Sequence, residues 1–221
     1  LGWDLRPPNV IKYSTPAMNG FTFTYNYSAD TTAVAGFEDN RRRADSFGLK
    51  YAKGPLYVNY AYETHRLSSI ADTGNPTEKG QRLGASYNFG AFKLVAMHQT
   101  LSDLGGTVSG GTAVKRTSYV VGGAYTAGNN VFKAQYVKAG SLNNTSTGAS
   151  AVDTGAKLWA IGWDHLFSKT TKMYVAYAKT DNDTNSTFSV NGPSAGVHSD
   201  FVAPAAGLDP ASWSVGMIVD F

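Results

Sequence analysis

The stretch ASWSVGMIVDF, residues 211–221, decides the fold of this chain. Its odd positions hold Trp213, Val215, Met217, Val219 and Phe221, and its even positions include Ser212, Ser214, Gly216 and Asp220. Side chains two residues apart lie on the same face of a β-strand, so one face suits lipid and the other suits water. Segments of about ten residues with this alternation are the sequence signature of transmembrane β-barrels.

Similar alternation recurs along the whole chain. Phe21, Phe23, Tyr25 and Tyr27, for example, alternate with Thr22, Thr24, Asn26 and Ser28. The pattern predicts eleven strands, at residues 9–15, 21–29, 44–53, 56–65, 81–89, 92–101, 116–127, 131–139, 156–167, 172–181 and 211–221. We therefore expect an all-β fold, a transmembrane antiparallel β-barrel, with residues 1–221 in a single domain.

The connections between these strands alternate in length. Short connections contain turn-forming residues such as Gly54-Pro55, Gly90 and Gly128-Asn129-Asn130. Long polar connections span residues 30–43, 66–79, 102–115, 140–155 and 182–210. This alternation predicts that all tight turns lie at one rim and all long loops at the other.

The composition agrees with this architecture. Aromatic residues make up 13% of the chain, charged residues make up 16%, and cysteine is absent. Disulfides and thiolate metal sites are therefore excluded for this chain. The chain contains no apolar run of about 18 residues, so no membrane-spanning helix is predicted. A mean hydropathy of -0.24 is compatible with membrane-spanning strands, because only every second residue of such a strand is apolar.

Aromatic residues cluster within a few residues of the short turns. They are Tyr13, Phe21, Tyr51, Phe89, Phe92, Tyr125, Phe132, Phe167 and Phe221. This placement predicts an aromatic girdle at one membrane interface. The alternative, which the alternation alone does not exclude, is that these aromatics form the core of a soluble β-sandwich.

Charged residues on the parity opposite the apolar one are candidates for lining a pore. The basic candidates are Lys12, Arg42, Lys50, Arg82, Arg116 and Lys133, and the acidic ones are Glu63 and Asp164. Fixed cations along a narrow channel raise the local concentration of anions. The sequence therefore predicts a mild anion preference, with solvated rim residues of no effect on permeation as the alternative for each position.

Three segments also resemble the trimeric general-diffusion porins of Gram-negative outer membranes. They are Asn9 to Pro16 followed by Gly20-Phe21, Gly162 to Thr171 with Tyr174, and the terminal Phe221. The second is similar to the Gly-x-Asp-Tyr-x-Leu-Ser-Lys-Arg-Thr hairpin of that family, although Thr170 replaces its Arg and His165 replaces an outward aromatic. In the family, the terminal Phe belongs to the signal read by the barrel-assembly machinery.

The resemblance implies a partial chain. Members of the family have sixteen strands, and counting back from Phe221 makes the first strand of this chain the sixth. The first five strands and the pore-narrowing third loop are therefore expected to be missing. Eleven antiparallel strands on their own would leave two unpaired edges in lipid.

The function implied is a passive diffusion channel for ions and small hydrophilic solutes, integral to the bacterial outer membrane and without cofactor or reaction. The resemblance also implies a homotrimer, contacts with outer-membrane lipid and lipopolysaccharide, and assembly through the last strand. The alternatives are a barrel with an adhesive or assembly role, which would have a plugged lumen, and a barrel enzyme of the phospholipase type.

Other motifs are weaker. Arg41-Arg42-Arg43 is too short a basic run for nucleic-acid binding. Contact with anionic lipopolysaccharide or steering of anionic solutes is favoured for it, with simple solvation as the alternative. His98 is the only mid-strand histidine that could serve a catalytic dyad, and nothing nearby in sequence is an activated nucleophile. The oxygen-rich run from Asp181 to Asn185 lacks the Gly and distal Glu of a calcium loop. We therefore expect no metal site.

Overall fold

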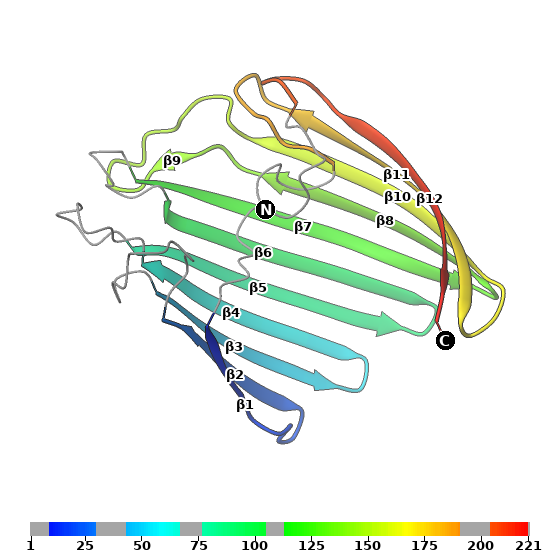
Figure 1. Ribbon diagram of the computed structural model, residues 1–221. Coiled ribbons are helices and arrows are strands. Elements are labelled where there is room, and N and C mark those ends of the chain that lie inside the picture. Colours follow the sequence, from blue (N-terminus) through cyan, green and yellow to red (C-terminus); the bar gives the residue numbers. More distant parts are fainter. Residues whose placement is uncertain (1–8, 30–42, 67–76, 105–112, 191–203, 221) are drawn as a thin grey trace.

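The computed structural model describes residues 9–29, 43–66, 77–104, 113–190 and 204–220, which form one antiparallel sheet (Figure 1). Its strands are β1 (Val10–Ser14), β2 (Phe21–Ser28), β3 (Ala44–Lys53), β4 (Leu56–Arg66), β5 (Thr77–Phe89), β6 (Phe92–Leu104), β7 (Val114–Ala127), β8 (Asn130–Ala139), β9 (Asn143–Asn144), β10 (Ala156–Leu166), β11 (Thr171–Asn182) and β12 (Ala211–Val219). In this part of the chain, no helix is long and apolar enough to cross a membrane.

All eleven predicted strands are present. The predicted range of β3 is confirmed at both ends, whereas β5 begins four residues before the predicted Gln81 and β7 two residues before the predicted Arg116. Apart from Val114 these extensions contain no large apolar residue, and they are strand because they pair with β4 and β9. The short β9, which pairs with β7, was not predicted.

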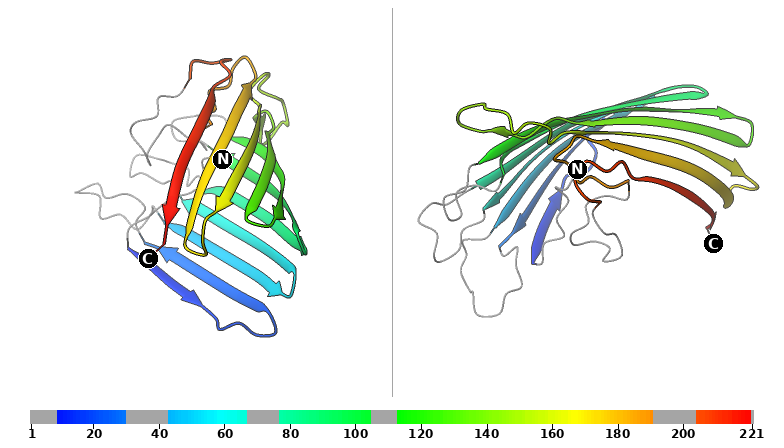
Figure 2. Two further views of the ribbon diagram at one scale, coloured as in Figure 1. Left: turned by 90° about the vertical axis from the view of Figure 1, so that its right-hand side faces the viewer. Right: turned by 90° about the horizontal axis from the view of Figure 1, so that it is seen from above.

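Each long strand pairs with its neighbour in sequence, except that β8 pairs with β10 across the segment containing β9. Within the described residues β1 pairs only with β2, and β12 pairs in the ladder only with β11. The sheet curls into an open trough, which Figure 2 shows from the side and from above. This agrees with the expectation of two unpaired edges.

The predicted alternation of connections is confirmed. The tight turns join β1 to β2, β3 to β4, β5 to β6, β7 to β8 and β10 to β11, and they gather at one rim of the sheet (Figure 1). Gly54 and Gly90 lie in two of these turns with φ of 57° and 69°. Glycine takes such left-handed backbone angles without steric cost, so these positions fix the tight turns.

The register divides the strand residues into two faces. We call the face that carries Thr22, Thr24 and Asn26 the inward face, and the face that carries Phe21 and Phe23 the outward face. Cα partners in neighbouring strands share a face, so the pairing extends both definitions across the sheet. Every buried residue within a strand lies on the inward face: Ser28, Ala44, His65, Gly80, Gly84, Gln99, Leu101, Ser118, Ala139, Ala156, Asp164 and Thr180.

The outward face has the opposite character. Most of the exposed large apolar side chains lie there, among them Leu83, Leu94, Val121, Ile161 and Val215. A soluble sandwich buries such a face under a second sheet, and the described residues form a single sheet. The molecule is therefore inside-out relative to a soluble sandwich, as a lipid-facing wall must be.

Two bands of aromatic residues mark the outward face. Near the tight turns, the Phe21 and Tyr51 rings lie 4.7 Å apart, and those of Phe92 and Tyr125 lie 4.5 Å apart. Phe221 lies outside the described residues. A second band, which was not predicted, lies nearer the long loops and contains Tyr119, Tyr136, Trp159, Tyr177 and Trp213.

Candidate functional site

The register places seven of the eight predicted pore-lining residues on the inward face. They are Lys12, Lys50, Glu63, Arg82, Arg116, Lys133 and Asp164. The eighth, Arg42, lies outside the described residues. The candidates that the structure describes thus share one face of the sheet, and their role in lining a pore stays a prediction.

The inward face carries three further charges. Lys93 on β6 is the partner of Ala124, Lys172 on β11 is the partner of Leu166, and Glu78 on β5 is the partner of His65. Lys93 and Lys172 alternate with outward apolar residues, so the parity signal would have found them. Glu78 was missed because it precedes the predicted start of its strand. Within the described strands, this face holds seven lysines or arginines and three carboxylates.

Asp164 on β10 joins two lysines near the tight-turn rim. Its Oδ1 lies 2.6 Å from Nζ of Lys133 on β8, and its Oδ2 lies 3.1 Å from Nζ of Lys172 on β11. The Asp164 side chain is only 8% exposed, whereas the two lysine side chains are 45% and 38% exposed. One carboxylate therefore neutralises part of the charge of two partly solvated ammonium groups.

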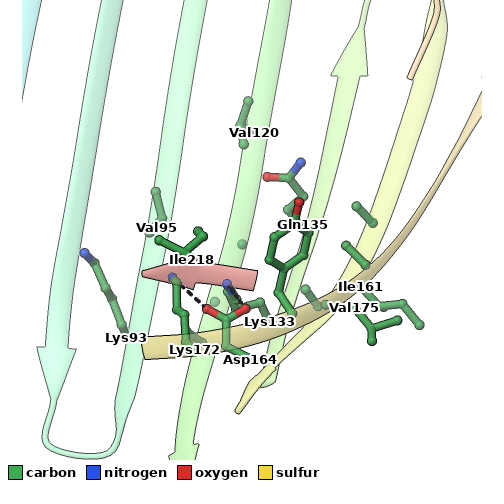
Figure 3. Close-up of a pocket in the computed structure, with 18 residues that line it drawn as sticks. Lys93, Val95, Val120, Lys133, Gln135, Ile161, Asp164, Lys172, Val175 and Ile218 are labelled. Atoms are coloured by element: carbon green, nitrogen blue, oxygen red, sulfur yellow. Dashed lines mark hydrogen bonds and ion pairs between the residues drawn. The ribbon is translucent and has the colours of Figure 1, made fainter. Parts of the chain in front are cut away.

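This cluster lies in a hollow of about 500 Å³ on the concave side of the sheet. Residues of β6, β7, β8, β10, β11 and β12 line it, and Figure 3 shows Lys93 at the same hollow as the Lys133–Asp164–Lys172 cluster. Gln135 and Tyr174 add polar groups to the lining. Three lysines and one carboxylate give this hollow a net positive charge, which attracts anions.

Four other charged residues of the inward face lie nearer to the long-loop ends of their strands: Glu63, Glu78, Arg82 and Arg116. Arg82 donates from Nε and from a terminal nitrogen to Oε1 of Gln99, at 2.9 and 2.7 Å. His65 is buried between Glu63 and Glu78; its Nε2 contacts Glu63, and its Nδ1 lies 3.9 Å from Oε2 of Glu78. These contacts hold the side chains against the wall.

Arg116 is tied to the loops at this end. Its Nε donates to the carbonyl of Gly140 at 3.1 Å, and a terminal nitrogen donates to the carbonyl of Thr154 at 2.9 Å. The guanidinium carbon also lies 4.9 Å from the ring centroid of Phe188. Arg116 therefore holds together two connections, residues 140–155 and the start of 183–210, in addition to carrying an inward charge.

Lys12, Lys50 and Lys93 differ from Arg116. All three are exposed on the inward face, and none forms an ion pair within the described residues. Unpaired, solvated cations contribute their full charge to the field along the wall. They are thus the strongest candidates for shaping ion selectivity.

Among the described residues, neither His98 nor the run from Asp181 to Asn185 is arranged as a catalytic or metal site. His98 lies on the outward face, and its contact is with the Tyr119 ring at 5.0 Å. In the oxygen-rich run, Asp183 accepts from the Gly155 amide at 3.0 Å, and the Asn182 side chain donates to the carbonyls of Phe188 and Leu208. The described part of the chain has no group of three or more metal-ligating side chains.

Comparisons with known proteins agree with this geometry. A family model described as Gram-negative porin matches residues 2–185. Outer membrane porin protein 32 of Delftia acidovorans is 30% identical over an alignment of 188 positions, which covers 83% of this chain and 49% of that protein. An outer membrane porin protein of Bordetella pertussis is 28% identical over an alignment of 210 positions, which covers 79% of this chain and 53% of that protein.

A solved structure extends the similarity to the fold. The anion-selective porin from Comamonas acidovorans matches with a TM-score of 0.74 and 27% identity, covering 97% of this chain and 60% of that one. The chain thus spans about half the length of the curated relatives it matches.

Proposed function

Because this chain belongs to the Gram-negative porin family, an integral outer-membrane family, we propose that it forms part of the wall of a passive diffusion channel. Ions and small hydrophilic solutes cross through the lumen by diffusion, with a mild preference for anions. Residues 1–221 contribute a single partial β-barrel domain, and additional strands complete the barrel. No reaction, cofactor or energy source takes part.

The charge of the inward face supports this proposal most directly. Seven cations and three carboxylates give the described wall an excess of four positive charges when His65 is neutral. A low-dielectric wall concentrates the field of such charges in the lumen, which raises the local anion concentration. The similar porin from Comamonas acidovorans is anion-selective, which favours the same direction of selectivity.

The partners follow from the family. We expect the complete protein to be a homotrimer in contact with outer-membrane lipid and lipopolysaccharide. We also expect its last strand, ending at Phe221, to be read by the barrel-assembly machinery.

Single-channel recording in planar bilayers tests the proposal. The native protein, extracted from outer membranes, is inserted under a gradient of potassium chloride, and the reversal potential is measured. We expect conductance steps in groups of three and a reversal potential of the sign produced by excess chloride flux. Silence from correctly folded protein would favour a plugged barrel with an adhesive or assembly role.

A further inference from the structure

Part of the inward face is apolar. The described strands carry four exposed large apolar side chains on this face: Val10, Tyr57, Val95 and Ile218. Val95 on β6 is 39% exposed and Ile218 on β12 is 41% exposed, and both line the hollow that contains the Lys133–Asp164–Lys172 cluster (Figure 3). Exposed apolar side chains that meet at one hollow offer contact area to an apolar group.

The floor of the hollow is made of small residues. Gly122 on β7, Ala160 and Gly162 on β10 and Ala176 on β11 all line it. A Cβ atom at Gly162 would have a backbone oxygen at 3.6 Å as its nearest neighbour, which is an ordinary contact, so the space above this position is open. A Cβ atom at Gly216 would lie 2.6 Å from the Tyr174 ring, so this ring packs directly on the β12 backbone. The floor therefore leaves room for a bound group.

The cations border this floor in a defined register. Lys93, Ala124, Lys133 and Gly162 are successive cross-strand partners on β6, β7, β8 and β10. The next inward row toward the long loops contains Val95, Gly122, Gln135 and Ala160. Positions two residues apart along a strand are separated by about 6.6 Å. Cations and apolar contact area thus follow each other along the wall within the length of a small organic acid.

The charge of the hollow is positive after its ion pairs are counted. Lys93 is exposed and forms no ion pair within the described residues, and Lys133 and Lys172 share Asp164. Asp220, two residues beyond Ile218, is exposed and pairs with none of these lysines. Even with Asp220 included, three cations face two carboxylates. One bound carboxylate is therefore electrostatically favoured.

We propose that this hollow binds small carboxylates with an apolar body, such as arylalkanoates, on their way through the channel. The carboxylate contacts Lys93 and the lysines of the cluster, and the apolar body lies on the small-residue floor against Val95 and Ile218. The volume of about 500 Å³ falls in the range of small-molecule sites, which combine an apolar lining with a few polar groups. The inference rests on the proposed diffusion function and adds a preference among anions, because chloride gains nothing from an apolar lining.

Block of the chloride current through the complete protein in planar bilayers tests for the site. The probe is 3-phenylpropionate. It is compared with acetate, which lacks the aromatic body, and with 3-phenylpropanamide, which lacks the charge. The concentration that halves the current is measured for each compound. Binding of the same compounds to the protein in detergent is measured by saturation-transfer NMR, which does not require a conducting channel.

Three variants separate charge from apolar contact. Lys93→Gln removes the unpaired cation, Val95→Thr replaces a methyl group by a hydroxyl group at nearly constant size, and Gly162→Leu fills the floor. Lys12→Gln and Val10→Thr are the matched controls, because both positions are exposed inward residues of β1 outside the hollow. The melting temperature of every variant is measured alongside.

We expect 3-phenylpropionate to halve the current at a concentration at least about tenfold below that of acetate, since each buried methylene group contributes about a fourfold gain in affinity. Val95→Thr should raise this concentration up to about fourfold, and Lys93→Gln up to about fivefold, which is the upper limit for one exposed ion pair. Gly162→Leu should remove the difference between 3-phenylpropionate and acetate. Both control variants should be blocked as the parent is.

Equal block by 3-phenylpropionate and either comparison compound would overturn the proposal, as would parent-like block in all three variants of the hollow. Absence of block and of binding, together with lower melting temperatures of these variants, would show that another part of the complete protein covers the hollow, which would also overturn it. A silent channel that still binds 3-phenylpropionate in the NMR measurement would contradict only the proposed transport function.

Discussion

The two faces of one sheet differ more than its two ends do. On the inward face the buried residues other than Leu101 are small or polar, and part of the charge is held in ion pairs such as Lys133–Asp164–Lys172. On the outward face, the middle of each long strand carries exposed apolar residues bounded by aromatic bands. Adjacent residues of one strand thus face different solvents, so the effect of a substitution depends on parity more than on residue type.

The largest expected effect comes from a charge placed on the outward face. Val121 on β7 is outward and 52% exposed, between the outward aromatics Tyr119 and Tyr125, while its neighbour Val120 is inward. Val121→Arg should destabilise the folded protein by about 2–4 kcal/mol, because the charge enters the hydrocarbon layer. Unfolding by urea in lipid vesicles measures this loss.

Val120→Arg is the matched control for that variant. It adds the same side chain to a polar lumen and should cost less than about 1 kcal/mol while increasing anion preference. Equal destabilisation by the two variants would contradict the assignment of the outward face to lipid and of the inward face to water.

A second effect concerns the charge cluster on the inward face. Asp164→Asn removes the carboxylate shared by Lys133 and Lys172, so the two ammonium groups repel each other. We expect a loss of about 1–2 kcal/mol, since the lysines are partly solvated, and a reversal potential shifted further toward anions. Asp103→Asn is the control, because it breaks an exposed pair with outward Lys79 and should leave selectivity unchanged.

Lys50 and Arg116 are both cations of the inward face, but they differ in their contacts. Lys50 is exposed and unpaired within the described residues, whereas Arg116 is bound to the carbonyls of Gly140 and Thr154. Lys50→Gln should reduce the anion-directed reversal potential while leaving the melting temperature nearly unchanged. Arg116→Gln should lower the melting temperature by a few degrees and increase current noise, because it releases the loops. If both variants changed the reversal potential and the melting temperature in the same way, the loop contacts of Arg116 would not explain a difference between the two cations.

The smallest effect is the dependence of selectivity on salt. The Debye length falls from about 10 Å at 0.1 M to about 3 Å at 1 M, so the field of the inward cations reaches less of the lumen. Anion preference should therefore decline steadily over this range. An anion preference that does not change with salt concentration would indicate that pore size or specific anion binding, and not the charge of the wall, determines selectivity.

Much of this arrangement follows from the sequence because strand parity is a local signal. The alternation in β2 and β12 and the glycine-containing turns define the strands, their order and their faces without any long-range information. Lys50 and Lys133 could be placed on the inward face for the same reason. Even Lys93 and Lys172, which were missed, carry that signal.

Features that depend on contacts between distant segments could not be predicted. The hydrogen bonds from Arg116 to the carbonyls of Gly140 and Thr154 join residues 24 and 38 positions apart. Likewise, β9 is a strand only because β7 extends far enough to pair with it. The ion pair of Lys179 with Asp209 likewise joins residues 30 positions apart. Parity gives the face of a residue, but it does not give the partner that neutralises its charge.

The central claim, that the two faces of the sheet meet lipid and water, is tested most directly on β7. The chain has no cysteine, so single cysteines at positions 118 to 125 each carry a unique spin label in the protein reconstituted in lipid. Relaxation by lipid-soluble oxygen should peak at odd positions, and relaxation by a water-soluble nickel complex should peak at even positions. Equal accessibility at odd and even positions, or a period near 3.6, would contradict the account.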